Sequence, residues 1–245
     1  DLIAARQPDI LCLQEFYEPL DSGKSNIRYI SENLHFPYYY FSRDEHNRYL
    51  KYEAGVIIFS KYPIVWAARR PYNTDKRVYS ESMVEADVLI NGKKIRVTTV
   101  HLQSVLFKSK DFRNLEIIRN GEDSMLFASK SLAKKLKYAF SRRGYQADTV
   151  RRNLDASPYP LIVCGDFNDV PNSYAYFRIK GNRQDAFIAK NFGIGRTYVR
   201  ISPTLRIDYI LSSENFKVLQ SRKIVNPYSD HYPVIADLLL PGNNR

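Results

Sequence analysis

The sequence predicts an α+β fold, a four-layer α/β/β/α sandwich of two mixed, mostly antiparallel sheets with outer helices. Chemically active side chains lie at both kinds of strand end. His101 is at the carboxyl end of one apolar run, whereas Asp208 is at the amino end of another. A parallel sheet gathers its chemistry at carboxyl strand ends only, so a shared site requires strands that run in both directions. The uninterrupted apolar run Leu161–Cys164 also indicates burial on both faces. Two packed sheets with helices outside meet both demands.

The predicted elements follow one another without a repeat or a linker, so we expect a single domain over residues 1–245. Residues 1–6 are typical of the last turns of a helix, which predicts an N-terminally truncated domain. Short apolar runs beside turn residues predict strands, and apolar residues three or four apart predict helices. The expected order is a strand over Asp9–Leu13, a helix over Ser25–Leu34, strands over Gly55–Ser60, Met83–Ile90 and Lys94–Leu102, helices over Met125–Phe140 and Gln146–Leu154, and strands over Leu161–Cys164, Ile207–Leu211 and Val234–Leu239.

Two of these predictions have the clearest signals. The turn Asn91-Gly92 predicts a hairpin between its flanking strands, because Asn-Gly is the strongest two-residue hairpin signal. The helix over Met125–Phe140 is amphipathic, with Leu132 and Leu136 on its apolar face.

Size and composition predict an ordinary globular protein. The chain has 245 residues, of which 44% are hydrophobic, and no apolar run reaches the ~20 residues of a membrane span. Cys12 and Cys164 both lie in apolar runs and are expected to be buried free thiols. Two cysteines alone form neither a disulfide scaffold nor a zinc site.

The charge is basic and uneven. The formal net charge is +11, and residues 108–152 alone hold 12 Lys or Arg against 5 Asp or Glu. Such a balance favours anionic partners, namely nucleic acid, phosphorylated small molecules or an acidic membrane surface. The basic helix in this segment could follow a phosphate backbone, lie on an anionic bilayer, or simply be a solvated helix that covers a sheet.

Five short motifs, each at the end of a predicted strand, occur in a characteristic order. They are Leu13-Gln14-Glu15, Val100-His101-Leu102, Gly165-Asp166-Phe167-Asn168, Ile207-Asp208-Tyr209 and Ser229-Asp230-His231. In this order they resemble the endonuclease/exonuclease/phosphatase superfamily, which has the fold of pancreatic deoxyribonuclease. The resemblance covers nearly the whole chain. The runs Tyr159–Asn168 and Leu205–Leu211 are most similar to a Bacteroidetes-type branch.

The resemblance implies a hydrolase of phosphoester bonds that depends on Mg²⁺ or Mn²⁺. Glu15 matches the metal-binding acid, since a hard dication prefers oxygen ligands and one or two carboxylates suffice. Asp230 matches a residue near the metal. Asp166 and Asn168 match the residues that orient the attacking water and bind the phosphoryl oxygens, although Asp and Asn also cap turns after strands.

The resemblance also implies the residues on the phosphate side of the site. His231 matches the histidine that contacts the phosphate, and Asp208 matches the acid that bonds its ring and favours the imidazolium. His101 matches a second phosphate-side histidine. Glu53 is expected either to partner His101, to lie near the metal, or to be a solvent-facing acid.

Two departures from the family pattern stand out. The family's first strand, which carries an Asn ligand to the metal, precedes the point at which this sequence begins. The arginine that the family often carries near Tyr79–Met83 is absent, and Arg77 could supply its phosphate contact.

The substrate stays open at this stage among nucleic acid, a phospholipid headgroup and a phosphorylated small molecule. The sequence lacks the Trp that inositol-phosphate phosphatases of the superfamily carry near Asp208. The aromatic run Tyr38–Phe41 could stack on a base or pack in the core. A further partner could be an anionic membrane surface, contacted through residues 108–152, and an absent N-terminal segment could associate the protein with a membrane. The alternative function is a catalytically inactive basic module that binds nucleic acid or an anionic membrane. We expect a monomer.

Overall fold

The computed structural model describes residues 2–72, 81–105, 107, 110–111, 113, 125–200 and 205–240. The first of its two main sheets has the strand order β1–β4–β2, with β3 also beside β4: β1 Ile10–Pro19, β2 Tyr38–Phe41, β3 Glu45–Asn47 and β4 Tyr52–Ser60. The second has the order β5–β6–β7–β8–β10–β9: β5 Ile64–Pro71, β6 Ser82–Ile90, β7 Lys93–His101, β8 Leu161–Asp166, β9 Gln184–Asp185 and β10 Asp208–Ser212. Among the described strands only β7 and β8 pair in parallel, so the sheets are mixed and mostly antiparallel, as predicted.

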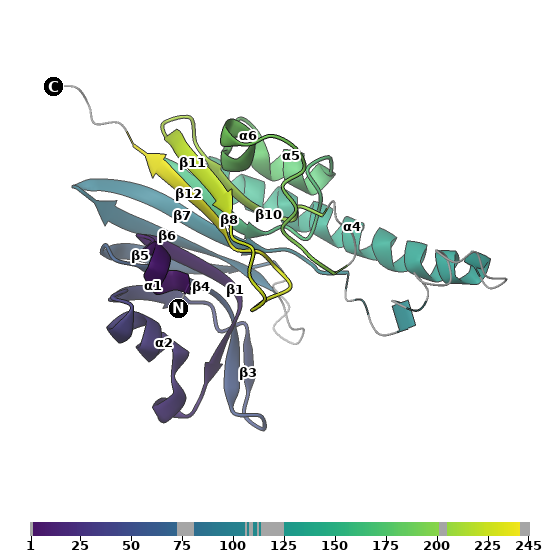
Figure 1. Ribbon diagram of the computed structural model, residues 1–245, viewed down its shortest axis with the longest axis horizontal. Helices are drawn as coiled ribbons and strands as arrows, with labels where there is room; N and C mark the ends of the chain where they lie inside the picture. The colour runs from purple at the N-terminus through teal and green to yellow at the C-terminus, as the bar shows by residue number, and fades with distance from the viewer. Residues whose placement is uncertain are drawn as a thin grey trace.

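Helices lie outside the sheets, and Figure 1 shows the longest of them, α4, reaching well beyond the strands. The helical segments are α1 Leu2–Arg6, a 3-10 turn Ser22–Lys24, α2 Asn26–Arg28 with the π-helical turn Tyr29–Asn33, α4 Met125–Asp155, α5 Tyr174–Lys180 and α6 Ala186–Lys190. The helix expected over Ser25–Leu34 therefore forms, as a mixed α and π segment.

Three hydrophobic clusters separate four layers. Alternate residues of β4 face opposite sides, so that Ile58 packs between the sheets, whereas Phe59 packs outward under Ile30 of the π-helical turn. On the far side, Val163 of β8 packs with Val150 of α4. This order of helix, sheet, sheet and helix confirms the predicted α/β/β/α sandwich.

The predicted hairpin forms between β6 and β7. Asn91 and Gly92 both have positive φ, 49° and 76°, which is the geometry of a type I′ turn. The turn sets a register in which Ile90 pairs with Lys93 and Met83 with Val100. As a result, β7 ends at His101.

The two helices expected over Met125–Phe140 and Gln146–Leu154 are one. Helix α4 runs without interruption through Gly144 for 31 residues. Arg143, Gln146 and Ala147 are all buried, so packing on both sides of the glycine holds the helical conformation.

The aromatic run Tyr38–Phe41 forms β2. Phe41 is buried and Tyr40 packs against the cluster between the sheets, whereas Tyr38 and Tyr39 are about two-fifths exposed. Tyr38 pairs with Ser60 at the carboxyl end of β4, whereas the bulge at Glu15 lies beside the middle of β4, between Gly55 and Ile57. Of the two predicted roles, the run therefore takes that of packing on the core.

A separate two-stranded ladder, β11 Lys217–Lys223 with β12 Val234–Leu239, completes the fold. Cys12 and Cys164 are free thiols, as expected, but are partly exposed rather than buried. A hydrogen bond with Cys164, together with desolvation of the sulfur atom, raises the pKa of the Cys12 thiol. No described helix is both long and apolar enough to cross a membrane.

Candidate active site

Three predicted residues meet because of strand register. His101 is the last residue of β7 and pairs with Asp166, the last residue of β8, across the parallel ladder. Asp208 opens β10 and pairs with Asp166 from the other side. Three neighbouring strands of one sheet therefore present His101, Asp166 and Asp208 at the same edge, which we call the catalytic edge.

The carboxyl end of β8 needs its glycine. Gly165 has a φ of 133°, and a Cβ there would lie 2.0 Å from the carbonyl oxygen of Val100. Asn168 has a φ of 51°, and its backbone N–H donates to Asp166 Oδ1 at 2.7 Å. Its side-chain Nδ2 donates to Asp166 Oδ2 at 3.0 Å and to the Leu102 carbonyl at 2.9 Å. Asn168 therefore orients Asp166, and its amide hydrogens are already engaged.

Asp208 and His231 form a close pair. Nδ1 of His231 lies 3.0 Å and 3.2 Å from the two carboxylate oxygens of Asp208. Burial alone would lower the pKa of His231, but the hydrogen bond and charge of Asp208, with smaller contributions from Asp166 and Asp230, raise it to about 9. His231 is therefore an imidazolium at neutral pH, and its Nε2 lies 4.0 Å from Asp166.

Asp166 is the most perturbed acid of the cluster. Burial, followed by the negative charge of Asp208, raises the pKa of Asp166 to about 7, against the opposing effect of His101 and His231. Its Oδ2 lies 3.9 Å from Nε2 of His101. The carboxylate can thus exchange a proton near neutral pH.

Glu15 differs from its predicted position at a strand end. Strand β1 continues to Pro19, and Glu15 lies within it at a β-bulge, where the pairing with β4 shifts between Leu13 and Phe16. Glu15 has a φ of 51°, and its side chain is 80% exposed. The bulge turns the carboxylate toward the catalytic edge, 3.7 Å from Nε2 of His101.

Asp230 stands at the rim of the site. Its carboxylate Oδ2 pairs with Nε of Arg200 at 3.0 Å. The backbone there is fixed by an isolated antiparallel bridge between Tyr198 and His231, with a hydrogen bond from the N–H of Val199 to the Asp230 carbonyl.

Glu53 is not the partner of His101, so that part of the prediction is wrong. Its two carboxylate oxygens bond Nε of Arg43 at 2.8 Å and Nδ1 of His46 at 3.1 Å. The reason is register, because Glu53 pairs with Glu18, beyond the bulge that presents Glu15. Glu15 and Asp166 instead lie within 4 Å of His101, at 3.7 Å and 3.9 Å from its Nε2.

Sequence reasoning missed Tyr198 and Glu81. The Tyr198 ring lies 4.9 Å from the His231 ring, and burial followed by the charge of Asp230 raises its pKa. Burial likewise raises the pKa of Glu81, against the opposing effect of nearby His101 and a hydrogen bond from Gln146. The position where the family often has arginine thus contains a partly buried acid, and Arg77 lies outside the described residues. No motif marks either residue, since tertiary packing alone brings them to the site.

The residues present fit a divalent cation. Atoms of Asp166, Asp208 and His231 lie within 4.8 Å of one another. A protonated His231 cannot be a metal ligand, because both of its ring nitrogens carry hydrogens. The acids of the edge remain, and the raised pKa of Asp166 shows that a negative charge here is poorly compensated by the protein alone. The exposed oxygens of Glu15 suit a hard cation that keeps several waters.

Two packed sheets that bring acids and histidines together at one sheet edge form the kind of site that a phosphoester hydrolase uses. A sequence profile of the endonuclease/exonuclease/phosphatase family matches residues 1–231, so the chain belongs to that family and is a hydrolase of phosphoester bonds. Among curated proteins no relative matches.

Solved structures of the same fold resemble this chain at low sequence identity. A family protein from Leptotrichia buccalis is 18% identical, with a TM-score of 0.66, over 97% of this chain and 90% of that one. The D. rerio TDP2 complexed with single-strand DNA product is 15% identical, with a TM-score of 0.65, over 97% and 88%. A mannosyl-6-phosphatase of Bacteroides thetaiotaomicron is 15% identical, with a TM-score of 0.62, over 97% and 88%.

Proposed function

We propose that this protein is a Mg²⁺- or Mn²⁺-dependent phosphodiesterase or nuclease that works by in-line attack of a water oriented by Asp166. The observation that supports this most is the surroundings of that carboxylate. It lies 3.9 Å from His101 and 4.0 Å from His231, and Asp208 bonds the far side of the His231 ring. A phosphoryl group among these residues would meet a proton acceptor and two histidine donors.

In this mechanism Asp166 accepts a proton from the attacking water. A general base works best when its pKa lies near the operating pH, and the pKa of Asp166 is about 7. Asn168 keeps the carboxylate oriented through its two hydrogen bonds to Asp166. Because Gly165 and Asn168 fix the loop backbone, the base is oriented before substrate arrives.

His231 stabilises the negative charge that develops on the phosphoryl oxygens. The imidazolium keeps its proton because its pKa is about 9, and Asp208 fixes the ring through Nδ1, which leaves Nε2 to donate. His101 supplies a second donor from β7. Tyr198 packs against the His231 ring and limits its rotation.

Glu15 and Asp230 are the residues that we expect to hold the cation. When bound, the cation would supply positive charge to the phosphoryl oxygens. Glu15 has the exposed carboxylate for this role. Asp230 would have to release Arg200, which is itself largely exposed.

The test is hydrolysis of bis(4-nitrophenyl) phosphate by the purified protein with Mg²⁺, with Mn²⁺ and with excess EDTA. We expect turnover with either metal and none in EDTA. His231→Ala should lower kcat/KM by ~10²-fold or more, whereas His46→Ala, a histidine outside the site, should leave it unchanged. Full turnover in EDTA, or equal losses in the two variants, would refute the proposal.

The alternative of an inactive basic module has less support. Such a module would have no need to keep Asp166 and Asp208 side by side, since two neighbouring buried carboxylates raise the free energy of the fold. A protein that binds nucleic acid but turns over no phosphoester under these conditions would revive it.

A further inference from the structure

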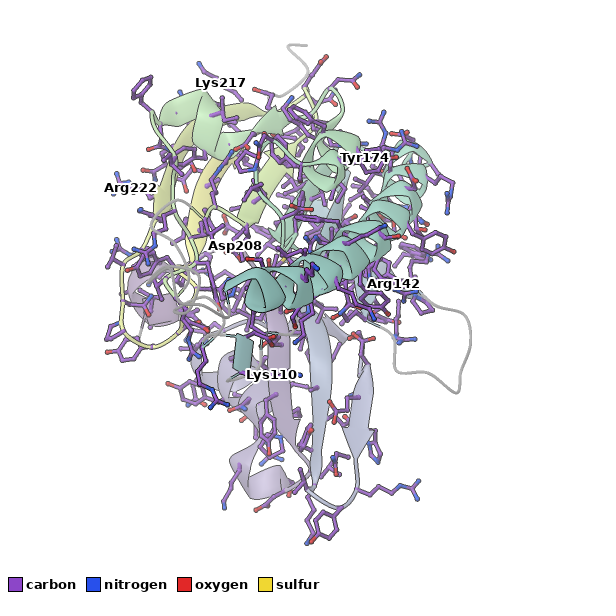
Figure 2. The ribbon with its side chains drawn as sticks, turned by 90° about the vertical axis from the view of Figure 1, so that its right-hand side faces the viewer. Lys110, Arg142, Tyr174, Asp208, Lys217 and Arg222 are labelled. Carbon is purple, nitrogen blue, oxygen red and sulfur yellow. The ribbon has the colours of Figure 1, made fainter. Side chains whose placement is uncertain are left out.

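The N-terminal half of α4 presents an unusually basic face. Lys130, Lys134 and Lys137 are all exposed and, at spacings of four and three residues, lie on one side of the helix. We call these three residues the lysine ridge. Figure 1 shows this part of α4 extending beyond the sheets, and Figure 2 looks at the molecule from the side toward which it extends.

The ridge lysines lie in a stretch of α4 that has no acidic neighbours in the sequence. Between Ser129 and Ala147 the sequence contains no Asp or Glu. Other bases of this helix have partners: Lys135 pairs with the buried Asp111 at 2.5 Å, and Arg143 pairs with Asp169 at 3.0 Å. Over the described residues, no carboxylate pairs with a ridge lysine.

Two aromatic side chains border the ridge. Tyr138 is 63% exposed and Tyr145 is 59% exposed. Cations beside exposed aromatic rings suit a single-stranded polynucleotide, whose phosphates take the charge and whose bases stack. A helix that lies in a bilayer instead needs a continuous exposed apolar face, and here Leu132 and Ala139 are buried, so that Phe140, 50% exposed, has no exposed aliphatic neighbour in Leu132 or Ala139.

The ridge is joined rigidly to the catalytic edge. Arg143 Nη1 donates to the carbonyl of Gln103 at 3.0 Å, and Gln146 Oε1 accepts from the Gln103 N–H at 2.8 Å. Gln103 follows His101 by two residues, and Asp169, the other partner of Arg143, follows Asn168. At a rise of ~1.5 Å per residue, Lys137 lies about 9 Å from Arg143 along the helix axis, and Lys130 lies about 20 Å from it.

We propose that the lysine ridge binds the phosphate backbone of a single-stranded polynucleotide whose scissile phosphate lies at the catalytic edge. This inference rests on the proposed function and narrows it to a substrate class that carries several phosphates. The ridge binds phosphates that do not react, so it contributes affinity rather than chemistry.

The experiment measures binding of a fluorescent oligothymidylate of about ten nucleotides by anisotropy, with EDTA present to prevent turnover. The ridge variant is Lys130→Gln, Lys134→Gln and Lys137→Gln together. The control carries Lys24→Gln, Lys190→Gln and Lys217→Gln, which removes the same charge from exposed positions off α4; Figure 2 labels Lys217 at the top of the molecule. Thermal melting checks that both variants fold.

We expect the ridge variant to bind the oligonucleotide at least about tenfold more weakly. The slope of log Kd against log salt concentration should decrease by about 2, since each phosphate contact with a single strand contributes ~0.7 to that slope. The control should stay within about twofold of the parent in affinity. Hydrolysis of bis(4-nitrophenyl) phosphate, which has one phosphate, should be equal in all three proteins.

Equal weakening in ridge and control variants would overturn the proposal, because net charge alone would then explain binding. It would also be overturned if the ridge variant lost binding to vesicles of phosphatidylcholine and phosphatidylserine but kept its affinity for the oligonucleotide. Failure of the parent protein to hydrolyse the small diester would count against the proposed function and leave the binding comparison intact.

Discussion

Two groups of buried acids lie on the larger sheet, and they differ in the side chains that pair with them. Glu85 and Asp87 of β6 are 1% and 5% exposed, and two arginines cover them. Arg96 makes a two-pronged contact with Asp87 and lies 3.7 Å from Glu85, which also pairs with Arg70 at 3.0 Å. At the catalytic edge, Asp166 is 6% exposed, and the cationic partners within 4.0 Å of it in the described part of the chain are the histidines His101 and His231.

The difference shows that the residue paired with a buried acid decides whether the acid stabilises the fold or can take part in a reaction. An arginine stays charged at all accessible pH values and holds a carboxylate in a fixed fork. The hydrogen bond that Arg96 donates to Asp87 even raises the pKa of Arg96, against the effect of its burial. Histidines gain and lose protons near neutral pH, so the charges of the catalytic edge can move during a reaction.

The largest effect should come from Asp166→Asn. It removes the proposed base while retaining the shape of the side chain, so kcat/KM should fall by ~10³-fold or more. The melting temperature should stay the same or rise, because a poorly compensated buried charge is gone. Initial rates and a thermal melt check both. A stability loss with only a minor rate effect would place Asp166 with the structural acids.

The opposite pattern should follow from Asp87→Asn. It leaves Arg96 buried with only a distant Glu85, so the free energy of unfolding should fall by about 3 kcal/mol. Turnover by the folded enzyme should be unchanged. Urea unfolding together with initial rates below the midpoint measures both quantities, and a specific loss of activity would contradict the comparison.

Glu15→Gln should weaken binding of the metal without affecting the fold. The carboxylate is 80% exposed and lies outside the β1–β4 ladder, so urea unfolding should not change. Activity at low Mg²⁺ should fall by ~10²-fold, with part recovered at high Mg²⁺, because a neutral amide binds a hard cation weakly. A Mg²⁺ titration of initial rates tests this, and an unchanged titration curve would show that Glu15 is not a ligand.

The smallest effect, and the most diagnostic, should be a shift of the pH–rate profile in Asp208→Asn. The carboxylate raises the pKa of His231 to about 9 and contributes to the rise of Asp166 to about 7. Without the negative charge of Asp208, the pKa of His231 and the pKa of Asp166 should both fall. The alkaline limb, where His231 loses its proton, and the acid limb, where Asp166 gains one, should therefore both move to lower pH.

His231→Ala should cost nearly as much as His231→Ala combined with Asp208→Asn, since the pair acts as one unit. Additive losses, with neither limb of the profile shifted in Asp208→Asn, would show that Asp208 only caps a strand.

Much of this arrangement could be predicted from sequence because its cause is local. His101, Asp166 and Asp208 each adjoin an apolar strand, and strand order then brings them together. The bulge at Glu15 could not be foreseen, because Asp9 to Pro19 has no glycine or proline to mark it before its end. Glu53 was misjudged for the same reason, since one irregularity in register changes which side chain faces the site.

Long-range packing accounts for the other differences. Gly144 is typical of a helix end, yet buried contacts of its neighbours carry α4 through it. Tyr198 reaches His231 only through an isolated bridge, and Glu81 approaches His101 only when the sheet has formed. Such contacts depend on the whole fold and leave no periodic pattern in the chain.

The bulge in β1 has a consequence for how such a protein evolves. The ladder with β4 runs from Ile10 to Leu13 and from Phe16 to Pro19, and it skips Gln14 and Glu15. Substitution at Glu15 is thereby uncoupled from the core, so lineages can explore new ligands there while the same sandwich keeps folding. Insertion or deletion of one residue beside Glu15 would instead turn Phe16 away from the core. We therefore expect the length of this segment to be conserved more strictly than the residue at position 15.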